Sequence, residues 1–421
     1  MDKIQIIGGN PLEGSIKISG SKNASLPILA STLLTDKSIE LLNIPNLSDI
    51  DSMINLLKSL DARIELNGEN LKINCQKPRT NFASYELVRK MRASFLVLGP
   101  LLARYGTAEV SLPGGCAIGA RPINIHLNGL EKLGAAFKIE NGYVRGTVNG
   151  YLKGSEIKLA ISSVGATENI LMAATLAEGK TIIKNAAKEP EIIDLCNFLN
   201  KMGANISGAG EDVIEIIGTS KLSGCSYSIM PDRIEAGTYA LSVLGCSGKV
   251  KLMSLNKFLI NHLKDIFLNI ESFKFNIIDE SSIVVESDTL HPKGLNIKTE
   301  PFPGFPTDLQ AQLTAALTKA NGVSFIEETI FENRFMHISE LHRMGAKILI
   351  EGSKVKIDGQ KKLFGAEVMA TDLRASSSLI IAGLMAEGKT TINRVYHLDR
   401  GYENIEKKLS ECKVNIKRIK N

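Results

Sequence analysis

Short strand-like segments alternate with longer apolar runs along the chain, and the strand-like segments recur at regular intervals. The apolar runs are rich in Ala, Leu and Ile with the period of a helix, as in residues 24–34 and 376–386. The six strand-like segments, each of which begins with a turn, are DKSIELLN from Asp36, GTAEVSL from Gly106, GKTIIKN from Gly179, GKVKLMS from Gly248, GVSFIEE from Gly322 and GKTTINR from Gly388. Successive segments start 66 to 74 residues apart, which indicates six copies of one structural unit.

A second helix follows most of these strands and ends at a glycine or at a residue that takes its place. Glycine at this point supplies the left-handed residue that stops a helix. The examples are LEKLGAAFKI from Leu130, LNKMGANISG from Leu199, LHRMGAKILI from Leu341 and the weaker LKSLDARIEL from Leu57 and LSECKVNIKR from Leu409. The pattern of each repeat therefore predicts a βαβαββ unit.

One such unit cannot bury its own apolar faces, so we expect three copies to pack around shared helices into a domain. The chain of 421 residues is also too long for one ordinary core. The sequence thus predicts an α/β fold of two similar domains, one spanning residues 22–230 and the other residues 1–21 and 231–421. The third copy gives way to the fourth near residues 227–232, and the N-terminal strand at residues 3–7 is expected to return to the second domain.

Composition and charge limit the classes of partner. The chain has no Trp and only 5% aromatic residues, which argues against a platform for stacking nucleic-acid bases. The 50 basic residues are interleaved with 45 acidic ones, for a net charge of +5, and this pattern favours a small anionic substrate over a polyanion such as nucleic acid.

The cysteines and the apolar runs bear on cofactors and location. The six cysteines, at positions 75, 116, 196, 225, 246 and 412, include no C-x-x-C pair and predict neither a metal site nor a disulfide framework. The sequence suggests no cofactor. The N-terminus has no signal-peptide pattern, and no apolar run reaches the ~18 residues that a membrane span needs. We therefore expect a cytoplasmic protein that does not bind membranes.

The residues just before the first helix of each copy predict anion sites. Small hydroxyl residues there cap helices, and the free N–H groups and dipole of a helix start attract anions. Positive charge is added by Lys22, Arg92, Arg233 and Arg374. If the two domains face each other, these helix starts are expected to line a cleft for a phosphorylated substrate.

The segment at residues 111–122, SLPGGCAIGARP, carries a candidate reactive thiol. Cys116 lies between Gly115 and Gly119 in a turn-rich loop and is followed by Arg121, and an exposed thiol near a cation can act as a nucleophile or proton donor. The alternative is a small apolar cysteine packed under a surface turn. The flanking glycines favour the functional interpretation.

Two other patterns are discounted. The segment from Gly383 to Thr390 matches the phosphate-loop pattern G-x-x-x-x-G-K-[ST], but it lies at the end of a helical run and precedes a strand, so we expect a helix-to-strand turn. His337 and His342 are five residues apart, which places them on different faces of a helix, so we expect them to be surface or packing residues and no metal ligands.

Nine motifs carry a resemblance along nearly the whole chain. They are GSKNASLPIL (20–29), MRAS (91–94), LPGGCAIGARP (112–122), SVGATENI (163–170), PDRIEAGT (231–238), FPTDLQAQ (305–312), FENRFMH (331–337), TDLRAS (371–376) and HLDRGYE (397–403). In these motifs and their order the chain resembles the enolpyruvyl transferase family, and within it the bacterial enzymes that act on UDP-N-acetylglucosamine. The resemblance implies two inside-out α/β domains of three repeats each, with the active site between them.

The same resemblance implies an activity. It is the transfer of the enolpyruvyl group of phosphoenolpyruvate to the 3′-hydroxyl of UDP-N-acetylglucosamine, with release of phosphate, as the first committed step of peptidoglycan synthesis. Cys116 is then expected to give a proton to the methylene carbon of phosphoenolpyruvate and to be able to form a covalent adduct. Asp308 is the expected general base. Lys22, Arg121 and Arg400 are expected to hold the phosphate and the carboxylate.

Further residues are expected to bind the substrates. By the resemblance they are Asn23, Arg92, Pro122, Ile123, Asn124, Ile125, Ser163, Val164, Asp232, Ile330, Arg334 and Asp372. The sugar nucleotide is expected along residues 121–125 and 161–164, with Asp308 and Ile330. Some relatives have a Lys where this chain has Ile161, so one side-chain contact to the uridine phosphate is absent here.

The residue types also suit the chemistry. Adding an alcohol across an enol ether needs a base for the hydroxyl and an acid for the methylene carbon. The anionic groups of the intermediate need fixed cations. Two alternatives stay open at this point. One is the sister enzyme, enolpyruvyl shikimate-phosphate synthase, which has the same fold and chemistry; the other is a non-catalytic sugar-nucleotide sensor on this fold.

Overall fold

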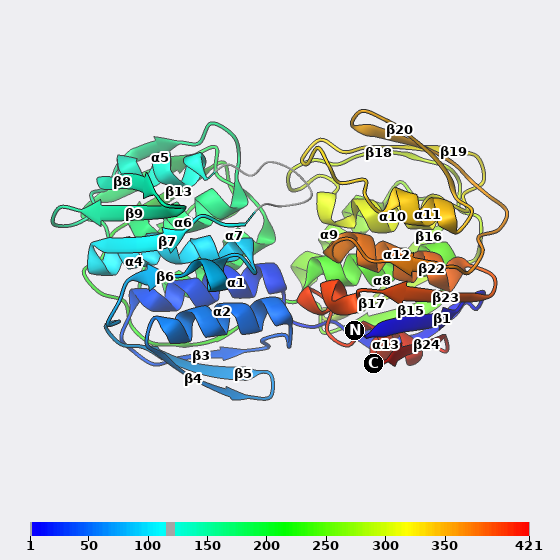
Figure 1. Ribbon diagram of the computed structural model, residues 1–421, viewed down its shortest axis with the longest axis horizontal. Helices are drawn as coiled ribbons and strands as arrows, with labels where there is room; N and C mark the ends of the chain where they lie inside the picture. Colours follow the sequence, from blue (N-terminus) through cyan, green and yellow to red (C-terminus); the bar gives the residue numbers. More distant parts are fainter. Residues whose placement is uncertain (1, 115–122, 421) are drawn as a thin grey trace. The chain divides into compact units, whose positions relative to one another are not determined.

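The structure, a computed structural model, describes residues 2–114 and 123–420, and these residues form two compact units (Figure 1). Unit 1 contains residues 2–19 and 231–420, and unit 2 contains residues 20–114 and 123–230. The first and the last described residues therefore both belong to unit 1. Cys116, Arg121 and Pro122 lie outside the described residues.

Six four-stranded sheets make up the β-structure of the described residues, three in each unit. In unit 2 the sheets have the strand orders β14-β3-β5-β4, β6-β7-β9-β8 and β10-β11-β13-β12. The strands are β3 (Ile39–Leu42), β4 (Ala62–Asn67), β5 (Asn70–Cys75), β6 (Phe82–Ala83), β7 (Thr107–Ser111), β8 (Ala135–Glu140), β9 (Tyr143–Val148), β10 (Glu156–Lys158), β11 (Lys180–Lys184), β12 (Asn205–Ser207), β13 (Val213–Ile217) and β14 (Ser226–Ser228).

The sheets of unit 1 have the orders β2-β15-β17-β16, β18-β19-β21-β20 and β22-β23-β1-β24. The strands are β1 (Lys3–Ile7), β2 (Leu12–Lys17), β15 (Gly248–Met253), β16 (Phe273–Asp279), β17 (Ser282–Ser287), β18 (Asn296–Lys298), β19 (Val323–Glu327), β20 (Lys347–Glu351), β21 (Lys354–Asp358), β22 (Glu367–Met369), β23 (Lys389–Asn393) and β24 (Asn415–Ile419).

All six sheets follow one scheme. The strand predicted at each copy pairs in parallel with one neighbour and antiparallel with the other. These predicted strands are β3, β7, β11, β15, β19 and β23. In the last sheet the antiparallel partner is β1, which lies between β23 and β24 with Ile4 opposite Ile392. The N-terminal strand thus completes the sheet of the sixth copy.

Helices that are buried on nearly every side occupy the interior of each unit. Every residue of α8 (Arg233–Cys246), α10 (Gln310–Leu317) and α12 (Leu373–Met385) is buried, and these three helices contact one another. In unit 2 the corresponding helices are α1 (Lys22–Ser31), α4 (Leu98–Tyr105) and α6 (Val164–Ala174). Because a helix without a polar face must be covered all round, the sheets lie outside these helices, which is the inside-out α/β arrangement that we expected.

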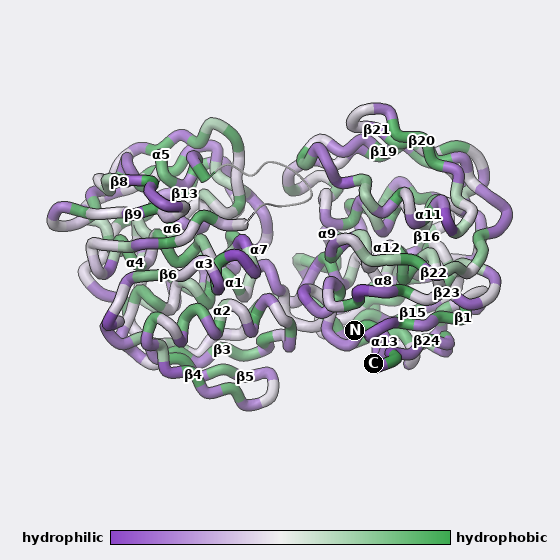
Figure 2. The backbone as a smooth tube through the Cα atoms, viewed as in Figure 1, coloured by the Kyte–Doolittle hydropathy of each residue, from purple (hydrophilic) through white to green (hydrophobic). Residues whose placement is uncertain are grey.

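The remaining α-helices are only partly buried. They are α2 (Ser48–Ser59), α3 (Tyr85–Val88), α5 (Asn124–Lys132), α7 (Pro190–Lys201), α9 (Lys257–Phe267), α11 (Ile338–Arg343) and α13 (Ile405–Ser410). The short 3-10 segments are η1 (Thr32–Leu34), η2 (Arg92–Val97), η3 (Thr307–Leu309) and η4 (Val395–Arg400). Figure 2 shows hydrophobic and hydrophilic stretches alternating along the chain in both units. Each unit thus buries the apolar faces of its own helices and sheets.

Left-handed residues end the helices and begin the strands where the sequence predicted them. Five of the six strand starts have a glycine with positive φ, between 71° and 112°. The three helices predicted to stop at glycine do so at Gly134, Gly203 and Gly345, with φ between 92° and 100°. At the weaker copies, Asp61 and Lys413 take the same place with φ of 60° and 61°.

The phosphate-loop pattern has the structure that we expected, and the two histidines lie at one buried and one exposed position. Gly383 lies within α12, Gly388 turns with a φ of 89°, and β23 follows, so the phosphate-loop pattern is a helix-to-strand turn. His337 is buried just before α11, and a ring nitrogen of His342 lies 2.8 Å from the carbonyl oxygen of Ile348. In the described ranges, no group of three His, Cys, Asp or Glu side chains is placed to hold a metal ion.

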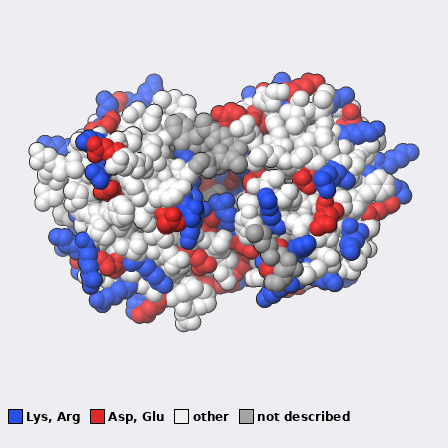
Figure 3. Space-filling model, in the orientation of Figure 1, with Lys and Arg blue, Asp and Glu red and all other residues white. Residues whose placement is uncertain are grey.

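The surface charges are mixed. On the face shown in Figure 3, Lys and Arg side chains are interspersed with Asp and Glu over each unit. None of the described helices has both the length and the apolar character that crossing a bilayer requires.

Candidate active site

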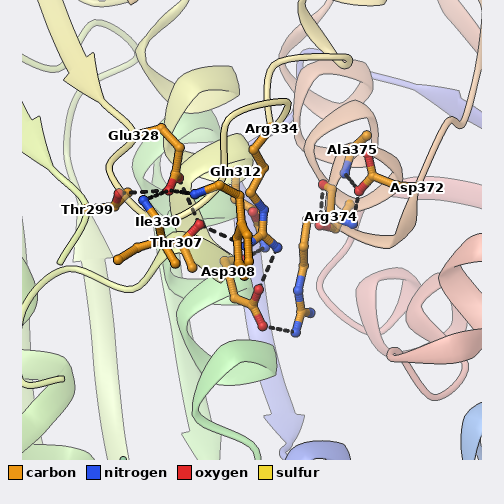
Figure 4. A network of polar contacts seen from close by, with 12 residues as sticks. Thr299, Thr307, Asp308, Gln312, Glu328, Ile330, Arg334, Asp372, Arg374 and Ala375 are labelled. Carbon is orange, nitrogen blue, oxygen red and sulfur yellow. Dashed lines mark hydrogen bonds and ion pairs between the residues drawn. The ribbon is translucent and has the colours of Figure 1, made fainter. Parts of the chain in front are cut away.

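In unit 1, Asp308 lies between two arginine side chains (Figure 4). Its Oδ1 accepts a hydrogen bond from Nη2 of Arg334 at 2.5 Å, and its Oδ2 accepts one from Nη2 of Arg374 at 2.9 Å. The arginine side chains are only 5% and 6% exposed, whereas that of Asp308 is 26% exposed. One carboxylate edge is therefore fixed by two buried cations while part of the group still reaches solvent.

This arrangement keeps Asp308 ionised. Burial alone would raise the pKa of Asp308, but the charges of Arg374 and Arg334 and their hydrogen bonds hold that pKa well below its usual range. Burial would likewise lower the pKa of Arg374, and the charge of Asp308 raises it instead. Asp308 is thus a permanent anion near neutral pH, suited to accept a hydrogen bond from a hydroxyl group.

The carboxylates of the candidate site have different local roles. Asp308 precedes α10 but makes no side-chain cap there, so capping does not account for its position. Asp372 caps α12 through hydrogen bonds from the amides of Arg374 and Ala375 to its Oδ1. Asp232 caps α8 in the same way. Two of the three predicted aspartates therefore also stabilise helix starts.

A buried glutamate joins Asp308 to Ile330. Oε1 of Glu328 accepts hydrogen bonds from the amides of Ile330, at 2.8 Å, and Phe331, at 3.1 Å. Its Oε2 accepts one from the hydroxyl of Thr307, the residue before Asp308, at 2.8 Å. One carboxylate thus holds the segments of two residues that were expected to contact the sugar nucleotide (Figure 4).

Arg400 ends η4 and is half-buried. His397, in the same turn, has a lowered pKa because of burial and the positive charge of Arg400, so it is neutral near pH 7. The structure places Arg400 in unit 1, to which Asp308, Arg334 and Asp372 also belong.

The remaining predicted residues that the structure describes belong to unit 2, where Lys22 begins α1. Ser21 caps this helix by accepting a hydrogen bond from the amide of Ala24. Lys22 is buried, with its Nζ 3.3 Å from Oδ2 of the buried Asp49, and the half-buried Asn23 follows it. The sequence pattern GSKNAS therefore places an ammonium group in the first turn of a buried helix.

Arg92 begins η2 of unit 2 and is half-buried near His126. Burial and the charge of Arg92 lower the pKa of His126 to about 4, so this imidazole is neutral near pH 7. Its Nδ1 lies 3.2 Å from Nδ2 of Asn169, while Oδ1 of Asn169 accepts from the amide of Gly99. Because Nδ2 of Asn169 is then the donor, His126 carries its proton on Nε2.

Two helix starts of unit 2 carry the residues expected to bind the sugar nucleotide. Ser163 caps α6 by accepting from the amide of Ala166, and Val164 is the first residue of that helix. Residues 123–125 form the start of α5, which contacts α6. Ile161 is 59% exposed just before α6.

Sequence reasoning missed several residues of these clusters. Arg374 was expected only as a cation at a helix start, and its contact with Asp308 was not predicted. Tyr402, whose hydroxyl accepts from Nη1 of Arg374, lies within the quoted motif HLDRGYE, which could have indicated it. Asp49 is in the first turn of a helix and Glu328 follows a strand, and neither position has a distinctive pattern. Most of the other predicted residues in the described part of the chain lie at helix starts, whereas Arg400 ends η4 and Arg334 lies in the turn before α11.

Comparison with known proteins gives consistent results. Residues 6–409 match the family model for EPSP synthase (3-phosphoshikimate 1-carboxyvinyltransferase). The chain is 52% identical to the UDP-N-acetylglucosamine 1-carboxyvinyltransferase of Geobacter metallireducens over 420 residues, which is all of both chains. It is 53% identical to the protein of the same name from Pelagibacter ubique over 423 residues, again covering both chains completely.

Solved structures agree on the fold. The enolpyruvyl transferase NikO from Streptomyces tendae matches with a TM-score of 0.88 at 21% identity and covers 99% of this chain and 98% of that one. EPSP synthase from Acinetobacter baumannii matches with a TM-score of 0.76 at 17% identity over both complete chains. On the full-length identities and the family match, the chain belongs to the enolpyruvyl transferase family.

Proposed function

We propose that the protein transfers the enolpyruvyl group of phosphoenolpyruvate to the 3′-hydroxyl of UDP-N-acetylglucosamine and releases phosphate. The observation that carries this proposal is about 52% identity, over the whole chain, to relatives named for that reaction. The cluster of Asp308, Arg334 and Arg374 supports it, because an ionised carboxylate held by two buried arginines is suited to orient an acceptor hydroxyl group.

The reaction needs an addition and an elimination. In the addition the 3′-oxygen bonds to C2 of phosphoenolpyruvate, its proton passes to a base, and a proton is added to the methylene carbon C3. In the elimination the C2–O bond to phosphate breaks and C3 loses a proton, which restores the double bond. One group must therefore accept a proton while another donates one.

The residues are assigned to these steps by their chemistry and by the resemblance. Asp308 accepts the hydrogen bond of the 3′-hydroxyl and takes its proton when the 3′-oxygen bonds to C2. The low pKa of Asp308 makes it foremost an orienting acceptor. Cys116 donates the proton to C3. Lys22, Arg121 and Arg400 hold the phosphate and carboxylate, while Asn23, Arg92, Arg334 and Asp372 complete the substrate contacts. The sugar nucleotide lies along residues 121–125, Ser163, Val164 and Ile330.

Two alternative functions have less support. The sister reaction on shikimate 3-phosphate shares the family model, but the relatives at about 52% identity are named for the sugar nucleotide. A non-catalytic sugar-nucleotide sensor would have no need of Cys116 or of cations for a second anionic substrate. The transferase on UDP-N-acetylglucosamine is therefore favoured.

A phosphate-release assay tests the proposal. Purified protein is mixed with phosphoenolpyruvate and either UDP-N-acetylglucosamine, shikimate 3-phosphate or no acceptor. We expect phosphate only with the sugar nucleotide, and a product heavier than the acceptor by one enolpyruvyl group in the mass spectrum. Phosphate released only with shikimate 3-phosphate would show that the protein catalyses the sister reaction. Release with neither acceptor would favour the non-catalytic sensor.

The proposed reaction defines a biological setting. It is the first committed step of peptidoglycan synthesis, so we connect the protein with cell-wall formation and hence with cell shape and division. The five cysteines in the described part of the chain are free thiols, which fits a reducing compartment, and we propose the cytoplasm. Phosphoenolpyruvate and UDP-N-acetylglucosamine are the proposed partners, with no nucleic acid or membrane.

A further inference from the structure

Both arginines that bind Asp308 have a second hydrogen bond to a hydroxyl group. Arg334 donates from Nη1 to Oγ1 of Thr307 at 2.8 Å, and Arg374 donates from Nη1 to the hydroxyl of Tyr402 at 3.1 Å. Each guanidinium also lies over an aromatic ring, of Phe331 at 5.3 Å and of Tyr402 at 5.6 Å from the ring centroid. Each cation is thus bound to Asp308 on one side and anchored on the other.

The direction of the hydrogen bonds at Thr307 is determined by its neighbours. Arg334 can only donate, so the one hydroxyl proton of Thr307 is directed to Oε2 of the buried Glu328. The oxygen of Thr307 is then left to accept from Arg334. Glu328 is itself held by the amides of Ile330 and Phe331, so this anchor is fixed to the backbone.

The hydroxyl of Tyr402 is surrounded in a similar way. It accepts from Arg374 and lies 3.1 Å from the donor Nε2 of Gln312, so its own proton is directed to Oγ1 of Thr238 at 2.8 Å. The hydroxyl of Thr238 in turn donates to the carbonyl of Ile234. Gln312 also donates to the backbone carbonyl of Asp308 at 2.8 Å. The Tyr402 anchor therefore connects Arg374 to two buried helices and to Asp308 itself.

We propose that the hydroxyl groups of Thr307 and Tyr402 are positioning groups that hold Arg334 and Arg374 on the Asp308 carboxylate. They fix the plane of that carboxylate, and so the direction in which it meets the acceptor hydroxyl. Without an anchor, a guanidinium with a long flexible stem can turn about its bonds and pull the carboxylate out of line. This inference rests on the proposed function for the role of Asp308, but the geometry of the cluster itself does not depend on the substrate.

The test uses substitutions that remove only a hydroxyl group. Thr307→Val and Tyr402→Phe are compared in the full-length protein with Thr314→Val and Tyr239→Phe. Thr314 and Tyr239 are buried in helices of the same unit, but their hydroxyl groups bond to Gln310 and Glu235 and not to the arginines. We expect kcat to fall about 10- to 100-fold in the anchor variants, with a smaller change in KM. The two control variants should keep the activity of the wild-type protein.

A second set of variants separates positioning from a general structural effect. Each anchor substitution is combined with Asp308→Asn. If the hydroxyl groups act through Asp308, they should lower kcat less than about twofold further in that background. An equal loss of kcat in both backgrounds, or an equal loss in the control variants, would overturn the proposal.

A measurement that needs no substrate completes the test. The 13Cγ resonance of Asp308, identified by its absence from the Asp308→Asn spectrum, reports the ionisation of this carboxyl group. Loss of an anchor should raise the pKa of Asp308, because the loosened arginine stabilises the carboxylate less. An unchanged pKa in both anchor variants would refute the positioning role. If wild-type protein releases no phosphate at all, the proposed function fails, and this titration alone decides the role of the two anchors.

Discussion

The two arginines beside Asp308 make its carboxylate a weak base, and this limits the role that it can have in catalysis. Burial favours the neutral form, yet two arginines within hydrogen-bond distance hold its pKa well below the ordinary 3.8. A carboxylate of this kind accepts a proton weakly but fixes the direction of a hydroxyl group strongly. Catalysis by Asp308 is therefore expected to come chiefly from orientation.

We expect Asp308→Asn to lower turnover by roughly 10²- to 10⁴-fold, because the amide cannot take the place of the charged acceptor. The variant should also lose about 1–3 kcal/mol of stability, since two buried guanidinium groups lose an anionic partner. Phosphate release and denaturant-induced unfolding measure the two effects. Asp288→Asn, at an exposed position of the same unit, serves as the control. Turnover close to that of the wild-type protein would remove Asp308 from the reaction.

The stability difference between wild-type protein and Asp308→Asn depends on pH in a way that follows from the lowered pKa of Asp308. A carboxyl group with a folded pKa below 3.8 contributes stability at pH values above 3.8 and loses it as the pH falls through the folded value. The difference in unfolding free energy between wild-type protein and Asp308→Asn should thus stay constant from pH 8 to pH 5. A difference that declines within this range would show that Asp308 titrates near neutrality.

The pKa of Asp194 in α7 is shifted in the opposite direction, upward. Burial raises its pKa to about 6, although Tyr227 and the amide of Met230 donate hydrogen bonds to its carboxylate and thereby lower it. Glu191 nearby raises the pKa further. Between 3.8 and about 6 the folded protein binds this proton more tightly than the unfolded chain, so this contribution to stability declines as the pH rises.

We therefore expect wild-type protein to lose up to about 3 kcal/mol relative to Asp194→Asn between pH 4 and pH 7. Urea-induced unfolding of both proteins at several pH values measures the difference. Tyr227→Phe is a useful companion, because it removes one hydrogen bond to the carboxylate and should shift the decline to higher pH. Parallel pH profiles of wild-type protein and Asp194→Asn would contradict the prediction.

Individual site residues were predictable only where a local motif carried them. Asp308, Arg334 and Asp372 were identified from their motifs, each a few residues long. The contact between Arg374 and Asp308 joins positions 66 apart in sequence, and no spacing rule predicts which of several cations reaches the carboxylate. Glu328 follows a strand in an ordinary position, and its importance arises from four donors that the fold brings together.

At the scale of the elements, the repeats end their second helix with a left-handed residue of different types. Where a second helix ends, Gly203 has a φ of 99° and Lys413 has a φ of 61° at the corresponding place. A side chain in the left-handed region costs about 1–2 kcal/mol, whereas glycine is free of this cost. Exchanging glycine and non-glycine residues at these equivalent positions therefore tests the cost of the left-handed conformation.

We expect Gly203→Ala to lower the unfolding free energy by about 1–2 kcal/mol and Lys413→Gly to raise it by up to about 1 kcal/mol. No neighbour lies within 4 Å of a Cβ added at Gly203, so the loss reflects backbone strain and not a clash. The pair of Lys413 with Glu13 is exposed and contributes little to stability. Denaturant-induced unfolding measures both variants, and effects of the same sign would contradict this account.

The sequence predicted the central strand of each sheet because a turn residue and an alternating pattern mark it. It did not predict the pairing partners. Five of the parallel neighbours, β6, β10, β14, β18 and β22, have only two or three residues, too few to show a period. The pairing of β1 with β23 joins opposite ends of the chain, and only tertiary packing determines that register.

At the scale of the whole molecule, each unit buries its own helices, and we propose that each is an independent cooperative domain. Leu241 in α8 and Leu171 in α6 are fully buried at the centres of unit 1 and unit 2. Replacing a buried leucine by alanine costs roughly 2–5 kcal/mol, and this loss should be confined to the unit that contains it.

Hydrogen exchange tests this independence in the full-length protein. Leu241→Ala should speed exchange in β15, β19 and β23 while that in β7, β11 and β13 stays unchanged, and Leu171→Ala should do the reverse. The decisive segment is β1, only 15 residues before α1 in sequence but paired with β23 and β24. Its amides should respond to Leu241→Ala and not to Leu171→Ala, because hydrogen bonding to the last repeat, and not proximity along the chain, assigns β1 to unit 1. Faster exchange of β1 in Leu171→Ala, or equal responses of both units to either substitution, would mean that the two units open together.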